Sequence, residues 1–326
     1  MAIIEDKNGG IWVGSEGNGF VKFENNNMMI PGDKNLSKMI ITEMTKDAKG
    51  DIWFSTYGNG LFKMEGNTLV RYSEKNGFSS DLLTSVKIDD SGNIWVGSDE
   101  KGVIKIETGK SCFYNLKLIN SARGLSNDNV YSIVQDKYGS MWFGTNRGGA
   151  NKYNGDKFLQ IYDGNVFSIT EDKNGAVWLG TNEEGIIKLV SDSSKTVWDK
   201  MSTITTSHGL PNNKVLCSYT DKMDRKWFGT NDGLCIIAGN TISTLNNENG
   251  LCGKKVLTIF EDRKGLFWFG MGEGEGIASF DGEKITCIKE LNKEFQSAIF
   301  TIAEDKTGRI WIGTESDGIV IWDGVH

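Results

Sequence analysis

The residues that could carry chemistry in this chain are polar side chains in the loops that join predicted β-strands. Amide and carboxylate groups can hydrogen-bond to hydroxyl-rich ligands, and a tyrosine ring or an arginine side chain can pack against a sugar ring. The alternative interpretation is that exposed loops are polar in any protein. We predict ligand binding by the loop residues Tyr57, Asn59, Arg123, Asn146, Arg147, Asn182, Glu183, His208, Asn231, Asp232, Glu273 and Glu315.

The sequence contains few residues that could carry out enzymatic chemistry. The chain has two histidines, His208 and the terminal His326, so a histidine-based metal or acid–base site has at most one sensible member. Glu273 and Glu275 could act as an acid and base pair, but their spacing does not fix a suitable separation. The sequence has no Gly-x-Ser-x-Gly elbow, phosphate-binding loop or dinucleotide fingerprint. We predict no catalytic residue, no metal site and no cofactor.

The charge pattern excludes two classes of partner. The net charge is −7, and the 36 basic and 43 acidic residues are interspersed, so no basic stripe is present to bind phosphates or anionic lipids. No apolar run is long enough to span a membrane, and the first residues lack the pattern of a signal peptide. Nucleic acid binding and membrane insertion are therefore not predicted.

The five cysteines, Cys112, Cys217, Cys235, Cys252 and Cys287, show no metal-site spacing. Their number is odd and no CxxC motif occurs, so neither a disulfide framework nor a zinc site is indicated. Most are expected to be free thiols, and Cys217 and Cys235 fall in predicted strands.

The elements that must position the loop residues come from a repeat. An aspartate is followed three residues later by glycine, three further on by tryptophan, and then by an apolar residue, glycine and threonine or serine. Intervals of 36 to 49 residues separate the signature tryptophans, a period typical of propellers and other repeat folds. The copies are centred on Trp12, Trp53, Trp95, Trp142, Trp178, Trp227, Trp268 and Trp311.

The residues of one repeat, 130–162, predict four strands. Residues 130–134, 140–145, 150–153 and 157–162 are short segments rich in β-branched and aromatic residues, separated by turn residues. We expect the repeat aspartate to close the first turn by accepting hydrogen bonds from amides two or three residues on, and the following glycine to adopt a positive φ. The sixth copy has Asp224 in place of this glycine. A calcium loop is the rejected alternative, because further carboxylates at alternate positions are missing.

The signature tryptophans are predicted to be core. Seven of the eight have apolar neighbours on both sides, so their strand must be covered on both faces, as it is when blades stack. The glycine two residues after the tryptophan, Ser55 in the second copy, indicates a narrow place where another group comes close.

The predicted fold is an all-β propeller of four-stranded antiparallel blades in a single domain, residues 1–326. Eight blades are favoured and seven are possible. The chain begins inside a first strand and stops where the eighth copy would begin its fourth strand, giving eight three-strand units and seven fourth strands. An uncovered blade edge of this kind can pair with a second copy of the chain.

The predicted ligand residues fall in two sets of loops on one face. One set joins strands two and three and also contains Asp99, Glu100, Glu275 and Asp317. The other joins strand four to the next blade and repeats a Gly-Leu or Gly-Phe pair four times, so most of that segment is expected to be structural.

The repeat resembles the two-component-regulator propeller repeat, which occurs in periplasmic or extracellular sensor regions of bacterial hybrid histidine kinases that respond to oligosaccharides. Residues 305–314, with the sequence DKTGRIWIGT, are among the closest to it. The resemblance covers all eight copies and implies a sensor propeller with an oligosaccharide ligand and a periplasmic or extracellular location. The further β-domain, membrane helix and kinase of such sensors are not in this sequence.

These observations order the hypotheses. A non-enzymatic ligand-recognition or sensor propeller comes first and a protein-interaction scaffold second. A propeller lyase or glycosidase comes third, because the virginiamycin-type lyase propeller has similar repeats but uses histidine and glutamate with a divalent metal.

Overall fold

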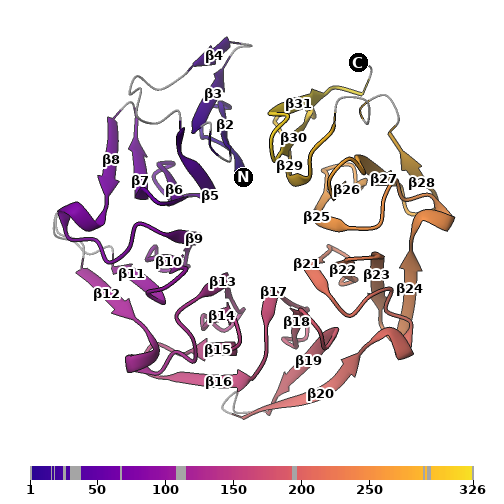
Figure 1. Ribbon diagram of the computed structural model, residues 1–326, viewed down its shortest axis with the longest axis horizontal. Coiled ribbons are helices and arrows are strands. Elements are labelled where there is room, and N and C mark those ends of the chain that lie inside the picture. Colours follow the sequence, from indigo (N-terminus) through magenta and orange to yellow (C-terminus); the bar gives the residue numbers. More distant parts are fainter. Residues whose placement is uncertain are drawn as a thin grey trace. The chain divides into compact units, whose positions relative to one another are not determined.

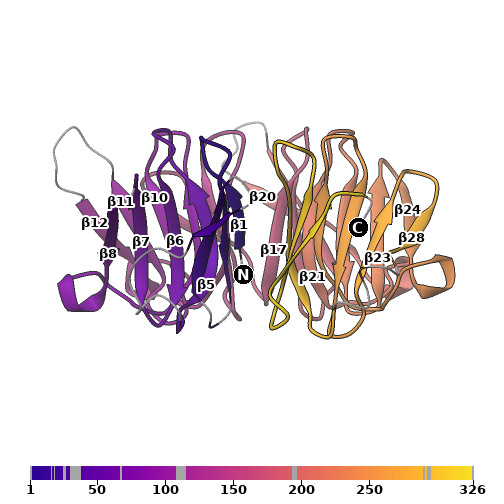
Figure 2. The same ribbon diagram turned by 90° about the horizontal axis from the view of Figure 1, so that it is seen from above.

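A computed structural model of the chain describes residues 2–15, 17, 19–24, 27–29, 38–66, 68–107, 115–192, 197–288, 291 and 295–324. Cys112 and His326 lie outside the described residues. The chain divides into two compact units, residues 1–164 and residues 165–326. Each unit is a row of β-sheets of the propeller class, and each sheet is one blade (Figures 1 and 2).

Unit 1 contains blades 1 to 4, each an antiparallel meander of four strands. The strands are β1 (Ala2–Glu5), β2 (Ile11–Gly14), β3 (Phe20–Glu24), β4 (Asn27–Met29), β5 (Ile40–Lys46), β6 (Ile52–Tyr57), β7 (Gly60–Glu65), β8 (Thr68–Tyr72), β9 (Leu83–Ile88), β10 (Ile94–Ser98), β11 (Val103–Glu107), β12 (Asn115–Ile119), β13 (Val130–Gln135), β14 (Met141–Thr145), β15 (Gly149–Tyr153) and β16 (Phe158–Tyr162).

Unit 2 contains blades 5 to 8, of which the last has three strands. The strands are β17 (Val166–Glu171), β18 (Val177–Thr181), β19 (Ile186–Ser191), β20 (Trp198–Ile204), β21 (Val215–Thr220), β22 (Lys226–Thr230), β23 (Gly233–Ala238), β24 (Thr241–Leu245), β25 (Val256–Glu261), β26 (Phe267–Met271), β27 (Ile277–Phe280), β28 (Ile285–Cys287), β29 (Ile299–Glu304), β30 (Ile310–Thr314) and β31 (Ile319–Trp322).

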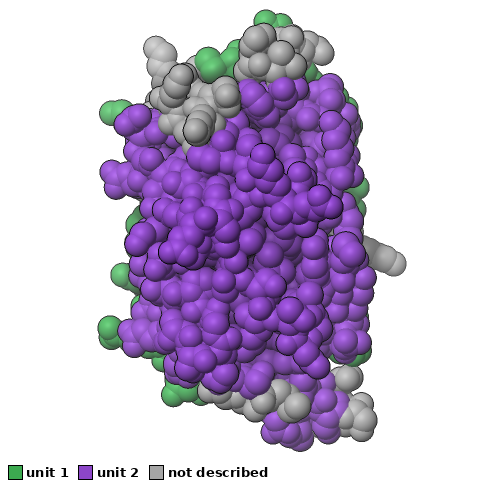
Figure 3. All heavy atoms as spheres, turned by 90° about the vertical axis from the view of Figure 1, so that its right-hand side faces the viewer, with its two compact units in different colours: residues 1–164 green, residues 165–326 purple. Residues whose placement is uncertain are grey.

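The predicted strand arrangement is confirmed. The four strands expected in residues 130–162 are β13 to β16, with ends within about one residue of the prediction. The described residues form eight sheets, of which seven have a fourth strand. Within each unit the first strand of every blade lies at the inner edge of the row and the last strand at the outer edge (Figure 1). Figure 3 shows the outward face of unit 2, where side chains form a continuous surface.

The repeat aspartate organises the first turn of every blade. In blade 4, Asp136 Oδ1 accepts the amides of Tyr138 and Ser140 at 3.0 and 2.8 Å, and Oδ2 accepts Trp142 Nε1 at 2.9 Å. The bonded amides thus lie two and four residues after the aspartate, rather than two or three. All eight copies make these three contacts, so the aspartate fixes the turn and the tryptophan together.

Backbone conformation explains the residue that follows in the turn. Gly139 has φ 83°, a region that glycine adopts without strain. Asp224 occupies this position in blade 6 with φ 65°, and aspartate is one of the few other residues that tolerate it.

The signature tryptophans are buried, as predicted, and within each unit they pack between neighbouring blades. Trp142 and Trp227 are fully buried, and the ring centroids of Trp227 and Phe267 in the next blade lie 4.2 Å apart. The glycine after the tryptophan makes room for this stacking. A Cβ on Gly229 would lie 2.7 Å from the backbone oxygen of Val256 in blade 7, so a larger residue would force these blades apart.

A cation accompanies most of the tryptophan–aspartate pairs. In blade 4, Lys152 on the neighbouring strand lies 3.1 Å from Asp136 Oδ2 and 5.4 Å from the ring centroid of Trp142. Blades 6 and 8 have isoleucine at that cross-strand position, and an arginine two residues before the tryptophan replaces the lysine. The Nε atoms of Arg225 and Arg309 lie 2.6 and 2.7 Å from the Oδ2 atoms of the blade aspartates.

These contacts change the acidity of the aspartates. Burial by itself would raise the pKa of Asp221, but hydrogen bonds from Trp227 and Arg225 outweigh burial and lower it. Burial would also raise the pKa of Asp305, but hydrogen bonds from Thr307, Trp311 and Arg309 outweigh burial and lower it. Both carboxylates are therefore stabilised in the charged form.

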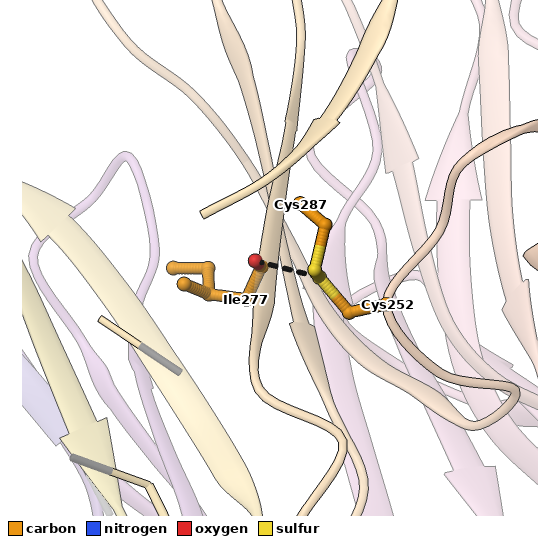
Figure 4. The surroundings of a disulfide bond; sticks show 3 residues. All are labelled: Cys252, Ile277 and Cys287. Atoms are coloured by element: carbon orange, nitrogen blue, oxygen red, sulfur yellow. Dashed lines mark hydrogen bonds between the residues drawn. A yellow bond between two sulfur atoms is a disulfide. The ribbon is translucent and has the colours of Figure 1, made fainter. Parts of the chain in front are cut away.

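The cysteine prediction was wrong for one pair. Cys252, in the loop before β25, forms a disulfide with Cys287 at the end of β28, with Cα atoms 5.2 Å apart (Figure 4). The pairing could not be deduced from spacing, because it arises where a connecting loop packs on the outermost strand of blade 7. Cys217 and Cys235 are free and lie in β21 and β23, as predicted.

Candidate ligand-binding site

The two predicted sets of loops lie next to each other within each unit. In unit 1, the amides of Gly58 and Gly102, between strands two and three, each donate to a carbonyl in the loop that leads to the next blade. In unit 2, the amides of Gly185 and Gly233 make the same link. These bonds join the loops into one polar surface per unit, which we call the rim.

Two predicted ligand residues belong to the repeated Gly-Leu segment. This segment forms short 3-10 turns: η2 (Glu74–Asn76), η3 (Ser121–Arg123), η4 (Thr206–His208) and η5 (Asn247–Asn249). Arg123 Nη1 donates to Leu118 O at 2.7 Å, and His208 Nδ1 accepts the amide of Thr205 at 3.3 Å. Both side chains thus tie a turn to the end of a fourth strand, at the outer edge of the blades (Figure 1).

In unit 2 the remaining predicted residues are spread over four blades. Asn182 Nδ2 lies 3.3 Å from Glu183 Oε1, and Asp232 pairs with Lys254 at 3.6 Å. Asn231, Glu273 and Glu315 are exposed at the ends of their loops.

Two further rim carboxylates of unit 2 accept hydrogen bonds from backbone amides. Asp317 Oδ2 accepts the amides of Gln296 and Ser297, and Glu275 accepts the amides of Lys254 and Lys255. No group of three or more histidine, cysteine or carboxylate side chains that could hold a metal occurs among the described residues.

In unit 1 the structure brings side chains from three blades together. Tyr57, at the end of β6 in blade 2, donates its hydroxyl to Asp99 Oδ2 of blade 3 at 2.6 Å. Asn129, just before β13 of blade 4, donates its side-chain amide to Asp99 Oδ1. The hydrogen bond from Tyr57 and the negative charge of Asp99 raise the pKa of the Tyr57 hydroxyl, so it stays protonated as a donor.

Tyr131 and Arg147 complete this group. Tyr131 is the extra residue of a β-bulge, because the register of β13 with β14 shifts between Val130 and Ser132. Bulges can re-aim a side chain, and the Tyr131 ring is 36% exposed. Burial and the charge of Asp99 raise the pKa of Tyr131, whereas the charge of Arg147 lowers it, so both charges act on this hydroxyl.

We call Tyr57, Asp99, Asn129, Tyr131 and Arg147 the Asp99 cluster. Of the predicted residues it contains Tyr57 and Arg147. Asn59 and Asn146 lie in the adjoining turns, where Asn59 O accepts Arg71 Nε at 2.9 Å and Asn146 N donates to Asn129 O at 3.0 Å. Asn129 and Tyr131 were not predicted, since neither the bulge nor the cross-blade contact has a signature in the sequence.

Comparison with known proteins finds a family model that matches four parts of the chain. A sequence model of the two component regulator propeller matches residues 1–17, 124–147, 163–183 and 294–316. These segments contain the tryptophans of blades 1, 4, 5 and 8. A search of curated proteins found no match.

Solved structures share the fold. The extracellular domain of a candidate one component system from B. thetaiotaomicron is 18% identical with a TM-score of 0.61, over 98% of this chain and 50% of that one. A catalytically inactive virginiamycin B lyase from Staphylococcus aureus, solved with quinupristin, is 16% identical with a TM-score of 0.61, over 86% of this chain and 94% of that one. The computationally designed Ika8 protein is 11% identical with a TM-score of 0.71, over 98% and 95% of the two chains.

At these identities the likeness extends to the fold alone. The chain spans half the length of the B. thetaiotaomicron extracellular domain that it matches. Among the described residues, no helix is long and apolar enough to cross a membrane.

Proposed function

The chain carries repeats of the two component regulator propeller family, and on that premise we propose that it is a non-enzymatic ligand-recognition domain that senses oligosaccharides. The observation that carries the proposal is the Asp99 cluster. A carboxylate that bonds to side chains of both neighbouring blades, beside two partly exposed tyrosine rings, offers hydrogen-bonding groups and stacking surfaces together.

Ligand recognition is favoured over catalysis because several rim side chains that could act as acids or bases already make structural hydrogen bonds. Asp317 and Glu275 hold backbone amides and His208 caps a 3-10 turn, so these groups are occupied in structural roles. Glu273, Glu315 and Asp232 come from three different blades. A protein-interaction scaffold is the second candidate, and a lyase follows it because a lyase shares the fold.

A thermal-shift screen against neutral and acidic oligosaccharides tests the proposal. A ligand specific for the folded state at about 100 times its Kd stabilises it by about 2.7 kcal/mol, which gives a clear rise in Tm. A protein that shows no shift with any sugar but forms a stable protein complex would be a scaffold. Turnover of a sugar that is abolished by Glu273→Gln would make it an enzyme.

A periplasmic or extracellular location is part of the proposal. The disulfide between Cys252 and Cys287 supports it, because disulfides persist in oxidising compartments. The resemblance implies the same location, and the bonded pair supports it although mostly free thiols were expected from the sequence.

We also propose that a second copy pairs along β31. Its four residues, Ile319–Trp322, are uncharged and half-buried, whereas the equivalent β23 is almost wholly buried beneath a fourth strand. Edge strands usually carry charge, proline or a bulge that blocks pairing, and β31 has none of these.

We therefore expect concentration-dependent dimers in sedimentation velocity, and expect Ile321→Lys to abolish them while Lys306→Ala at a turn of the same blade does not. A wild-type protein that stays monomeric up to about 100 µM would contradict the pairing, since a dimer with a Kd of about 100 µM or tighter, about 5.5 kcal/mol of association or more, is substantially populated at that concentration.

A further inference from the structure

Arg147 adopts a backbone conformation that the same turn gives to glycine in two other blades. Its φ is 57°, whereas Gly17 and Gly58 stand at this position in blades 1 and 2 with φ of 90° and 102°. A non-glycine residue in this region is strained. Blade 4 thus keeps an arginine where glycine would suit the backbone better, and strain of this kind is characteristic of groups that contact a ligand.

The Asp99 cluster also holds a buried acceptor. The Asp99 carboxylate only accepts hydrogen bonds, so the side-chain NH2 of Asn129 must face it and Oδ1 must face the other way. Asn129 Oδ1 is buried and receives no hydrogen bond from any described protein group. A buried acceptor without a donor is unfavourable, and a ligand hydroxyl would supply the donor.

The charges are arranged around the bulged tyrosine. Asn129, two residues before Tyr131, bonds Asp99 through its side chain and accepts the amide of Asn146, the residue before Arg147. An acceptor group and a cation therefore lie near the same partly exposed ring. A ligand ring stacked on Tyr131 would meet acceptors from Asp99 and Asn129 and donors from Arg147. Such a ring needs hydroxyl donors together with an anionic acceptor.

We propose that the Asp99 cluster binds a uronic acid unit of an acidic oligosaccharide. Its hydroxyls donate to Asp99 and to Asn129 Oδ1, its ring packs on Tyr131, and its carboxylate accepts from the Arg147 guanidinium, which is well matched to a carboxylate. This inference rests on the proposed function and adds the sugar class and the residues that select it.

Titration calorimetry with matched sugars tests the inference. Oligogalacturonate, alginate and chondroitin digests serve as uronate probes, and galacto-, malto- and xylo-oligosaccharides serve as neutral probes. We expect the wild type to prefer a uronate probe, and Arg147→Gly to weaken its binding by about tenfold or more, as loss of a charge-assisted hydrogen bond does. Arg147→Gly should also raise the Tm, because glycine relieves the positive φ. Tyr131→Ala should weaken the same probe.

Gly17→Arg is the matched control. It places the same strained residue in the equivalent turn of blade 1, where a new Cβ has no other atom within 4 Å. It should lower the Tm and leave uronate affinity unchanged. Preference for neutral sugars, or uronate binding by Arg147→Gly within about twofold of wild type, would overturn the inference and leave sugar sensing intact. Failure of the wild type to bind any sugar would instead overturn the proposed function.

Discussion

Replacing Asp136 with alanine is expected to destabilise the protein by about 3 to 5 kcal/mol, the usual range when one partner of a buried ion pair is removed. The substitution removes acceptors for two turn amides and for Trp142 Nε1, and takes from the buried Lys152 the carboxylate 3.1 Å away. Chemical denaturation followed by tryptophan fluorescence measures the loss.

Asp262→Ala in blade 7 separates the ion pair from the hydrogen bonds. Asp262 accepts the same two amides and Trp268 Nε1, but within the described part of the chain no cation pairs with it. Serine stands opposite Trp268, where blade 4 has Lys152. We expect a smaller loss, about 2 kcal/mol, from the hydrogen bonds alone. Equal losses in the two variants would show that the Lys152 contact adds nothing.

Reduction of the disulfide is expected to lower the free energy of unfolding by about 4 kcal/mol, because the bond closes a loop of 35 residues and restricts the unfolded chain. The measurement is the denaturation midpoint with and without a reducing agent. The double variant Cys252→Ser, Cys287→Ser should match the reduced wild type.

The double variant should show no further change on reduction, which controls for effects of the reagent on the other thiols. Cys217 and Cys235 serve as internal references, because burial raises the pKa of each thiol to about 12 and leaves them inert at neutral pH. A reduced wild type that unfolds at the same midpoint as the oxidised protein would contradict the expected stabilisation.

Most of the blade architecture follows from local pattern. Short segments rich in β-branched and aromatic residues, separated by glycine and asparagine turns, were enough to place β13 to β16. The repeat aspartate was correctly predicted as a turn residue. The hydrogen bond from the tryptophan Nε1 to its second carboxylate oxygen was not predicted. That contact joins residues six apart, and it exists only after the hairpin has formed.

The candidate site was only partly predictable. Tyr57 and Arg147 stood out as polar residues in loops, while Arg123 and His208 stood out for the same reason and tie 3-10 turns to the fourth strands. Loop composition does not distinguish these roles, because the hydrogen-bond partner of each side chain is set by packing on a neighbouring strand.

The sequence by itself determined the class of fold, the strands of each blade and the eight tryptophans that pack between blades. These features depend on local periodicity and on residues a few positions apart, which the chain displays directly. The tertiary structure alone decided that Cys252 meets Cys287, that Arg225 and Arg309 replace the missing lysines, and that Asp99 joins side chains of three blades. The contacts of Asp99 join residues 30 and 42 positions apart, and such distant pairings exist only once neighbouring blades have packed together.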